Sequence, residues 1–167
     1  MRARKAGLAD VADICRICRD AWRDTYAGVY DADEIERIVA RYYSRERVRE
    51  EVRRPEDWDG WWVAEDDAGR IVAAGGGGMT APCVGEVFVL YADPPRRGEG
   101  AGTAILAAVT EEQRSQGARE QWVSVEPQNE NGLRFYRARG FRRRGSRPLH
   151  GNEPGDDRVS LRLSRRI

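Results

Sequence analysis

Residues 86–104 read EVFVLYADPPRRGEGAGTA. The first six are nearly continuous in apolar side chains, which is typical of a strand buried on both faces and predicts a central place in a sheet. Gly98, Gly100 and Gly102 then alternate with other residues, so the backbone can turn tightly and approach a ligand closely. A helix is predicted from Thr103, and the unpaired N–H groups at its start form, with the helix dipole, a site suited to phosphate or pyrophosphate.

Arg96 and Arg97 add positive charge at the rim of this turn. The turn matches neither of the two common nucleotide motifs. A Walker A loop needs a Gly-Lys pair, which the sequence lacks, and Thr103 stands where the dinucleotide fingerprint has its third glycine. By itself the turn is therefore as consistent with an ordinary strand-to-helix connection as with a phosphate site.

A second motif follows one strand later. Residues 129–141 read NENGLRFYRARGF and predict a short helix that ends at Gly140. Together the two motifs resemble those of the GNAT superfamily of N-acetyltransferases. That family's acetyl-CoA motif, R-x-x-G-x-G/A, is matched by Arg97, Gly100 and Gly102. Its later motif, N-x-x-A-x-x-F-Y-x-x-x-G-F, is matched except at the alanine, which Gly132 replaces, by Asn129, Phe135, Tyr136, Gly140 and Phe141.

The start of the chain extends this resemblance. Residues 21–28, AWRDTYAG, are similar to the W-x-x-x-Y-x-G opening of many bacterial and archaeal members. The resemblance implies an α/β (α+β) fold with a mixed, mostly antiparallel sheet of about seven strands. About four or five helices would flank the sheet, and two strands would splay apart at the cofactor. We expect residues 1–167 to form a single acetyltransferase domain.

The resemblance also implies acetyl-CoA as cosubstrate. The pantetheine arm would pair with the central strand, the glycine turn and its arginines would hold the pyrophosphate, and a later asparagine would bind the arm. The residues so assigned are Leu90, Tyr91, Ala92, Arg96, Arg97, Gly98, Glu99, Gly100, Ala101, Gly102, Thr103 and Asn129. By the same analogy Tyr136 would lie near the sulfur and donate a proton to the leaving thiolate.

Acetyl transfer to an amine needs a base, because an amine is mostly protonated at neutral pH and cannot then attack a thioester. Two candidates remain open. Glu86 lies on the central strand, where several family members carry a catalytic glutamate, but it is equally a charged residue at a strand start. His150, the only histidine, lies in a loop that borders the acceptor site in this family. A backbone N–H of the central strand would stabilise the oxyanion.

The acceptor itself cannot be identified from the sequence. A small molecule, a polyamine or a protein N-terminus is possible, and Tyr26 and Tyr30 either line its pocket or pack in the core. A non-catalytic acyl-CoA-binding module is the main alternative to an enzyme. A nucleic-acid-binding domain that uses Arg142, Arg143 and Arg144 is a weaker one.

Hydrophobic periodicity places the remaining elements. Strands are predicted at residues 2–6, 61–64, 71–74, 122–125 and 159–163, and helices at 8–22, 31–42 and 45–53. Asp31 and Glu34 suggest a capping box, and Ser44 an N-cap. The four glycines at 75–78 predict a weakly specified backbone.

Composition sets the remaining limits. The 29 basic and 28 acidic residues nearly cancel, which argues against a dedicated nucleic-acid or membrane-surface protein. No signal peptide and no long apolar run is visible, so we expect a cytoplasmic protein, and a homodimer is possible by analogy. Cys15 and Cys18 fall on the apolar face of the first helix and are expected to be buried thiols, with no metal site.

Overall fold

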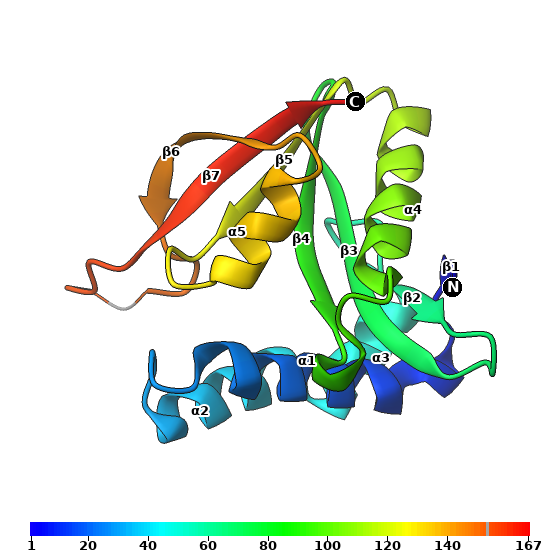
Figure 1. Cartoon of the computed structure of the whole chain (residues 1–167), viewed down its shortest axis with the longest axis horizontal. Helices are drawn as coiled ribbons and strands as arrows, with labels where there is room; N and C mark the ends of the chain where they lie inside the picture. Colours follow the sequence, from blue (N-terminus) through cyan, green and yellow to red (C-terminus); the bar gives the residue numbers. More distant parts are fainter. Residues whose placement is uncertain (153) are drawn as a thin grey trace.

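A seven-stranded mixed sheet forms the centre of the molecule, with helices on both faces (Figure 1). The computed structural model describes residues 1–152 and 154–167. The strand order is β1-β2-β3-β4-β5-β7-β6, and every neighbouring pair is antiparallel except β4 and β5. The strands are β1 (Arg2–Lys5), β2 (Trp62–Glu65), β3 (Ile71–Ala81), β4 (Val84–Ala92), β5 (Glu120–Val125), β6 (Arg142–Pro148) and β7 (Val159–Arg166). The predicted fold class and the central place of β4 are confirmed.

The α-helices pack against the sheet in two separate apolar clusters. They are α1 (Val11–Tyr26), α2 (Ala32–Tyr42), α3 (Arg45–Arg53), α4 (Ala101–Ser115) and α5 (Glu130–Arg137). One apolar cluster joins α4 and α5 to the sheet, and a second joins α1 and α3 to it. Cys15 and Cys18 lie in this second cluster as buried free thiols, as predicted. Within the part of the chain that the structure describes, no helix is both long and apolar enough to cross a bilayer.

Two helix starts test the predicted caps. Ser44 caps α3, because its hydroxyl oxygen accepts a hydrogen bond from the backbone N–H of Arg47 at 3.3 Å. Asp31 stands at the N-cap of α2, but its side chain makes no capping hydrogen bond. The predicted capping box at α2 is therefore wrong, although the start of the helix is correct.

The glycine run at 75–78 is part of a continuous strand rather than a weakly specified segment. All four glycines are buried. A Cβ atom at Gly75 would lie 2.7 Å from the carbonyl oxygen of Val89, and one at Gly77 would overlap the carbonyl oxygen of Glu86. At Gly76 a Cβ would overlap the carbonyl oxygen of Gly60, and at Gly78 one would lie 3.0 Å from Trp58. The run is thus required by close approach of β4 and of residues 58–60, and the predicted weakly specified backbone is wrong.

The central strand carries an irregularity that opens the sheet. Gly76 pairs with Val89 and Gly77 with Val87, so Phe88 is an extra residue on β4, as in a β-bulge. Pairing between β4 and β5 ends just there, at Val87. The last five residues of β4 have no partner on β5, which is the predicted splayed strand pair.

Candidate functional site

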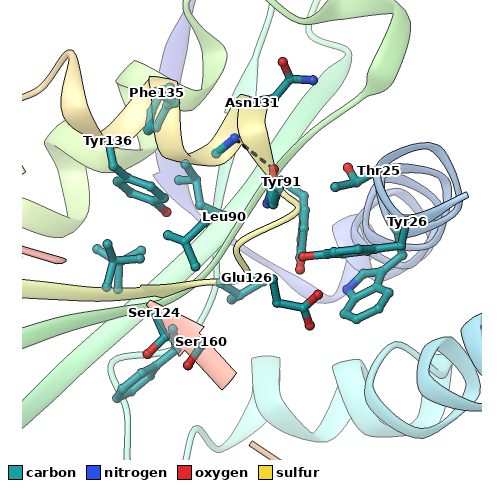
Figure 2. Close-up of a pocket in the computed structure, with 18 of the residues that line it drawn as sticks. Thr25, Tyr26, Leu90, Tyr91, Ser124, Glu126, Asn131, Phe135, Tyr136 and Ser160 are labelled. Atoms are coloured by element: carbon teal, nitrogen blue, oxygen red, sulfur yellow. Dashed lines mark hydrogen bonds between the residues drawn. The ribbon is translucent and has the colours of Figure 1, made fainter. Parts of the chain in front are cut away.

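A cavity of about 1440 Å³ lies where β4 and β5 diverge. Its walls come from β4, the ends of α1 and α4, the helices α2 and α5, and the connection between β6 and β7 (Figure 2). We call the part beside residues 90–103 the glycine-turn end. We call the part beside α2, residues 147–152 and residues 156–160 the α2 end. Most of the predicted site residues line this one cavity: Tyr26, Leu90, Tyr91, Ala92, Arg96, Arg97, Gly98, Gly100, Ala101, Gly102, Thr103, Asn129, Tyr136 and His150.

The glycine turn has the conformation that its sequence predicts. Gly98 and Gly100 have φ angles of +86° and +91°, which side-chain-bearing residues rarely adopt. No described atom lies within 4 Å of a Cβ at either position, so the constraint there is conformational. At Gly102 the constraint is steric, because a Cβ would lie 3.2 Å from the ring of Phe135. The turn leaves the first N–H groups of α4 facing the cavity, where they suit an anion.

The two arginines at the turn already have acidic partners. Arg96 pairs with Glu99 at 2.7 Å and with Asp66 at 3.1 Å. Arg97 pairs with Asp24 near the end of α1. Glu99 does not line the cavity; its carboxylate holds Arg96 instead. The arginines therefore also connect the turn to the rest of the fold.

Asn129 and Gly132 form the start of α5. The side-chain oxygen of Asn129 accepts a hydrogen bond from the backbone N–H of Gly132 at 2.8 Å and so caps the helix. A Cβ atom at Gly132 would lie 2.8 to 3.0 Å from the Asn129 side chain. Glycine at this position leaves the Asn129 side chain room to cap the helix.

Tyr136 is buried in the wall opposite β4. Its ring packs edge-on against Phe135 and Phe141, with centroid distances of 5.1 and 5.2 Å. Burial raises its pKa, so the hydroxyl keeps its proton at neutral pH. Figure 2 shows this hydroxyl pointing toward Leu90, at the splayed part of β4. A protonated hydroxyl in this position can act as a proton donor.

Glu86 lies on β4 but does not line the cavity. Its carboxylate is 4% exposed and is held by two guanidinium groups. Arg162 approaches it to 2.5 Å and Arg147 to 3.2 Å. Both carboxylate oxygens of Glu86 are therefore hydrogen-bonded to arginine, and the residue lies outside the cavity lining.

Glu126 is a buried carboxylate of the cavity lining that makes no ion pair with another described residue, unlike Glu34 and Asp156, and sequence reasoning missed it. It follows directly on β5, where the strand diverges from β4, and it is 8% exposed. One carboxylate oxygen accepts a hydrogen bond from the Tyr30 hydroxyl at 2.6 Å. The other has no hydrogen-bond partner among the described residues. Burial raises the pKa of this carboxyl group. The signal in the sequence was an acidic residue directly after the mostly apolar segment 122–125.

An aromatic cluster of Trp22, Tyr26 and Tyr30 lies next to Glu126. Tyr26 lies between the other two rings, at centroid distances of 4.3 Å from Trp22 and 5.4 Å from Tyr30. Trp22 and Tyr26 line the cavity, whereas Tyr30 does not and instead donates a hydrogen bond to Glu126.

His150 is exposed at the α2 end, with its ring centroid 6.3 Å from that of Tyr42. No group of His, Cys, Asp and Glu side chains in residues 1–152 and 154–167 is arranged to hold a metal ion.

Known proteins share both the sequence pattern and the fold. Residues 17–141 match the acetyltransferase (GNAT) family. The chain is 25% identical over 143 residues to spermidine N(1)-acetyltransferase of Thermoplasma acidophilum, a match that covers 83% of this chain and 86% of the relative. It is 32% identical over 125 residues to mycothiol acetyltransferase of Actinosynnema mirum, covering 68% of this chain and 41% of the relative. The crystal structure of the PaiA N-acetyltransferase of T. acidophilum in complex with coenzyme A superposes with a TM-score of 0.82, at 23% identity and with 99% and 98% of the chains covered.

Proposed function

The chain belongs to the acetyltransferase (GNAT) family and is an N-acetyltransferase that uses acetyl-CoA, and from this premise we propose that it acetylates a small-molecule amine directly, in a ternary complex. The observation that carries the proposal is that a candidate proton acceptor and a candidate proton donor line the same cavity. Glu126 offers an unpartnered carboxylate oxygen and Tyr136 a protonated hydroxyl, and both line the same cavity.

The residues at the glycine-turn end fit acetyl-CoA. The open edge of β4 offers backbone groups to the amides of a pantetheine arm, since β5 does not pair with it there. Gly98 and Gly100 keep the turn free of side chains beside the first N–H groups of α4, as a pyrophosphate requires. When bound, acetyl-CoA supplies the acetyl group as a thioester, which an uncharged amine can attack.

Glu126 is proposed as the base in place of Glu86. A raised pKa strengthens a carboxylate as a proton acceptor, and the free oxygen of Glu126 can take a proton from an ammonium group directly or through one water. Tyr30 orients the carboxylate through its hydrogen bond and is a positioning residue. Tyr136 would donate its proton to the leaving sulfur, and an unpaired N–H of the splayed part of β4 would stabilise negative charge on the acetyl oxygen.

Steady-state kinetics test the direct transfer. Initial rates are measured by thiol release while acetyl-CoA and an accepted amine are varied together, and mass spectrometry identifies the acetylated product. A ternary complex gives double-reciprocal lines that intersect. Parallel lines, which indicate a covalent acetyl-enzyme, would overturn the proposed direct transfer.

Matched glutamine variants test the base. We expect Glu126→Gln to lower kcat about 10²- to 10⁴-fold, which is the usual contribution of a general base, while acetyl-CoA affinity stays the same. Glu86→Gln is expected to lower the melting temperature, because it leaves Arg147 and Arg162 without a buried counter-charge. A large loss of kcat in a folded Glu86→Gln protein, with Glu126→Gln active, would reverse the assignment.

A polyamine is a second candidate acceptor. The relative from T. acidophilum named for spermidine matches most of this chain. Glu126 beside the rings of Trp22 and Tyr26 also suits an ammonium group on an alkyl chain. An assay that compares spermidine with alkylamines of a single amino group separates this candidate from a general amine acceptor.

A further inference from the structure

The α2 end of the cavity carries charged side chains that acetyl transfer alone does not explain. The residues of α2 that line it form one stripe: Glu34, Arg37, Ile38, Arg41 and Tyr42. Facing them, the chain from the end of β6 to the start of β7 contributes Arg147, His150, Asp156 and Arg158, among others. Arg158 joins the two walls, since it pairs with Glu34 at 2.7 Å and with Asp156 at 2.5 Å.

The charged side chains here are of two kinds, those with an ion-pair partner and those without one. The carboxylates of Glu34 and Asp156 share Arg158, and Arg147 is engaged by Glu86. Arg37 and Arg41 have no acidic partner among residues 1–152 and 154–167. Among the acidic residues of the described lining, Glu126 is the one that makes no ion pair. At the α2 end, two guanidinium groups thus lack an acidic partner within the described chain, and Glu126 of the same cavity lacks a basic one.

Helix geometry places the two arginines together. Residues four apart lie on one face of a helix, separated by about 6 Å along the axis, so Arg37 and Arg41 point to the same side. Both side chains are exposed, and both line the cavity together with Ile38 between them. Guanidinium groups on successive turns can grip a carboxylate or phosphonate with several charge-assisted hydrogen bonds.

We propose that the acceptor carries an anionic group as well as its amine, and that Arg37 and Arg41 bind this group while Glu126 receives the amine. The proposal rests on the proposed function and names its substrate class: an amino acid or a related amino-phosphonate. A polyamine is disfavoured, because its second ammonium would meet two guanidinium groups at the α2 end.

The test uses acceptors that differ only in the distal group. Straight-chain ω-amino acids and common L-amino acids are compared with the matching alkylamines, diamines and aminoalkylphosphonates, with thiol release as the readout. We expect kcat/KM for the anionic acceptors to exceed that for the matching alkylamine and diamine about tenfold or more. The carboxylate and phosphonate series show which anion the site accepts.

Arginine variants locate the effect. Arg37→Gln and Arg41→Gln are expected to raise KM for anionic acceptors about tenfold each, while KM for alkylamines that lack an anionic group and the Kd for acetyl-CoA stay the same. Arg49→Gln is the matched control, since Arg49 is exposed on α3 and lies outside the cavity. Anionic acceptors should also raise the melting temperature of the wild type but not of the Arg37→Gln/Arg41→Gln double variant.

The possible failures are distinguishable. Diamines preferred over amino acids, or arginine variants with unchanged KM for anionic acceptors, would overturn the proposed acceptor class and leave acetyl transfer intact. No acetylation of any amine in the panel, with acetyl-CoA bound, would overturn the proposed function itself.

Discussion

The two ends of the cavity are built by different means. At the glycine-turn end the ligand-facing groups are mostly backbone: the N–H groups at the start of α4 and the unpaired edge of β4 beyond its bulge. At the α2 end they are side chains from separate elements, held by ion pairs such as that of Arg158 with Glu34. Tyr136 lies at the junction between the two.

This difference bears on what each end can recognise. A backbone site depends on the path of the chain, so it tolerates changes of nearby side chains and suits a ligand that many proteins share. A side-chain site changes with each substitution, and it can therefore set the acceptor of one particular enzyme. The predictions below challenge this division, starting with the largest expected effect.

Tyr136→Phe tests the junction. Removing the hydroxyl takes away the proposed proton donor, so we expect turnover to fall about 10²-fold or more. The Kd for acetyl-CoA, measured by titration, should not change, because the backbone groups proposed to hold it remain. A Tyr136→Phe enzyme with full turnover would show that another group protonates the thiolate.

The pH profile tests the α2 end. Since burial raises the pKa of Glu126, its base form is populated only above that raised value, and kcat/KM should fall as pH drops through it. The acid limb should therefore lie above the ordinary glutamate pKa of about 4.3. Residual activity of Glu126→Gln should lack this limb; a limb that persists in the variant would assign it to another group.

Gly100→Ala tests the backbone end. A side chain in the left-handed region costs about 1–2 kcal/mol, and relief of this strain would move the N–H groups of α4. We expect the Kd for acetyl-CoA to rise about tenfold, the change that ~1.4 kcal/mol produces. Gly145→Ala in β6 is the matched control, because this glycine has open space around it and no positive φ. Equal effects of the two variants would remove the special role of the turn.

Glu126→Gln should also have a small effect on stability. The pKa of Glu126 is raised on folding, so its ionised form is less stable in the folded protein, and stability is lost as pH rises through the raised pKa. A neutral amide costs less to bury, so at pH 7 the variant should melt at a slightly higher temperature than the wild type. The gain should vanish at acidic pH; a lower melting temperature at pH 7 would contradict the raised pKa.

Local patterns predicted much of this molecule correctly. The strand-turn-helix at residues 86–104 and the motif around Tyr136 are defined by short spacings, so their conformation follows from neighbouring residues. The glycine run at 75–78 was misjudged for the opposite reason. Gly75 and Gly77 are required by contacts with β4, and Gly76 and Gly78 by contacts with residues 58–60. Nothing in the run itself shows which segments will lie against it.

The choice between two glutamates shows where sequence reasoning ended. Glu86 lies on the expected strand, yet Arg147 and Arg162, more than sixty residues later, occupy its carboxylate. Glu126 gave little signal, and its free oxygen is apparent only once Tyr30 and the splayed strands surround it. Whether a charged side chain finds an ion-pair partner depends on residues far away in the chain, and these cannot be identified from the spacing of neighbouring residues.

The sequence by itself determined the family resemblance, the cofactor turn and the tyrosine, because each depends on glycine conformation or helical spacing within one short segment. Only the tertiary structure decided which carboxylate faces the cavity and which arginines stay unpaired at the α2 end. Those properties arise from burial and from ion pairs between distant segments, and both exist only after the sheet and its helices have assembled.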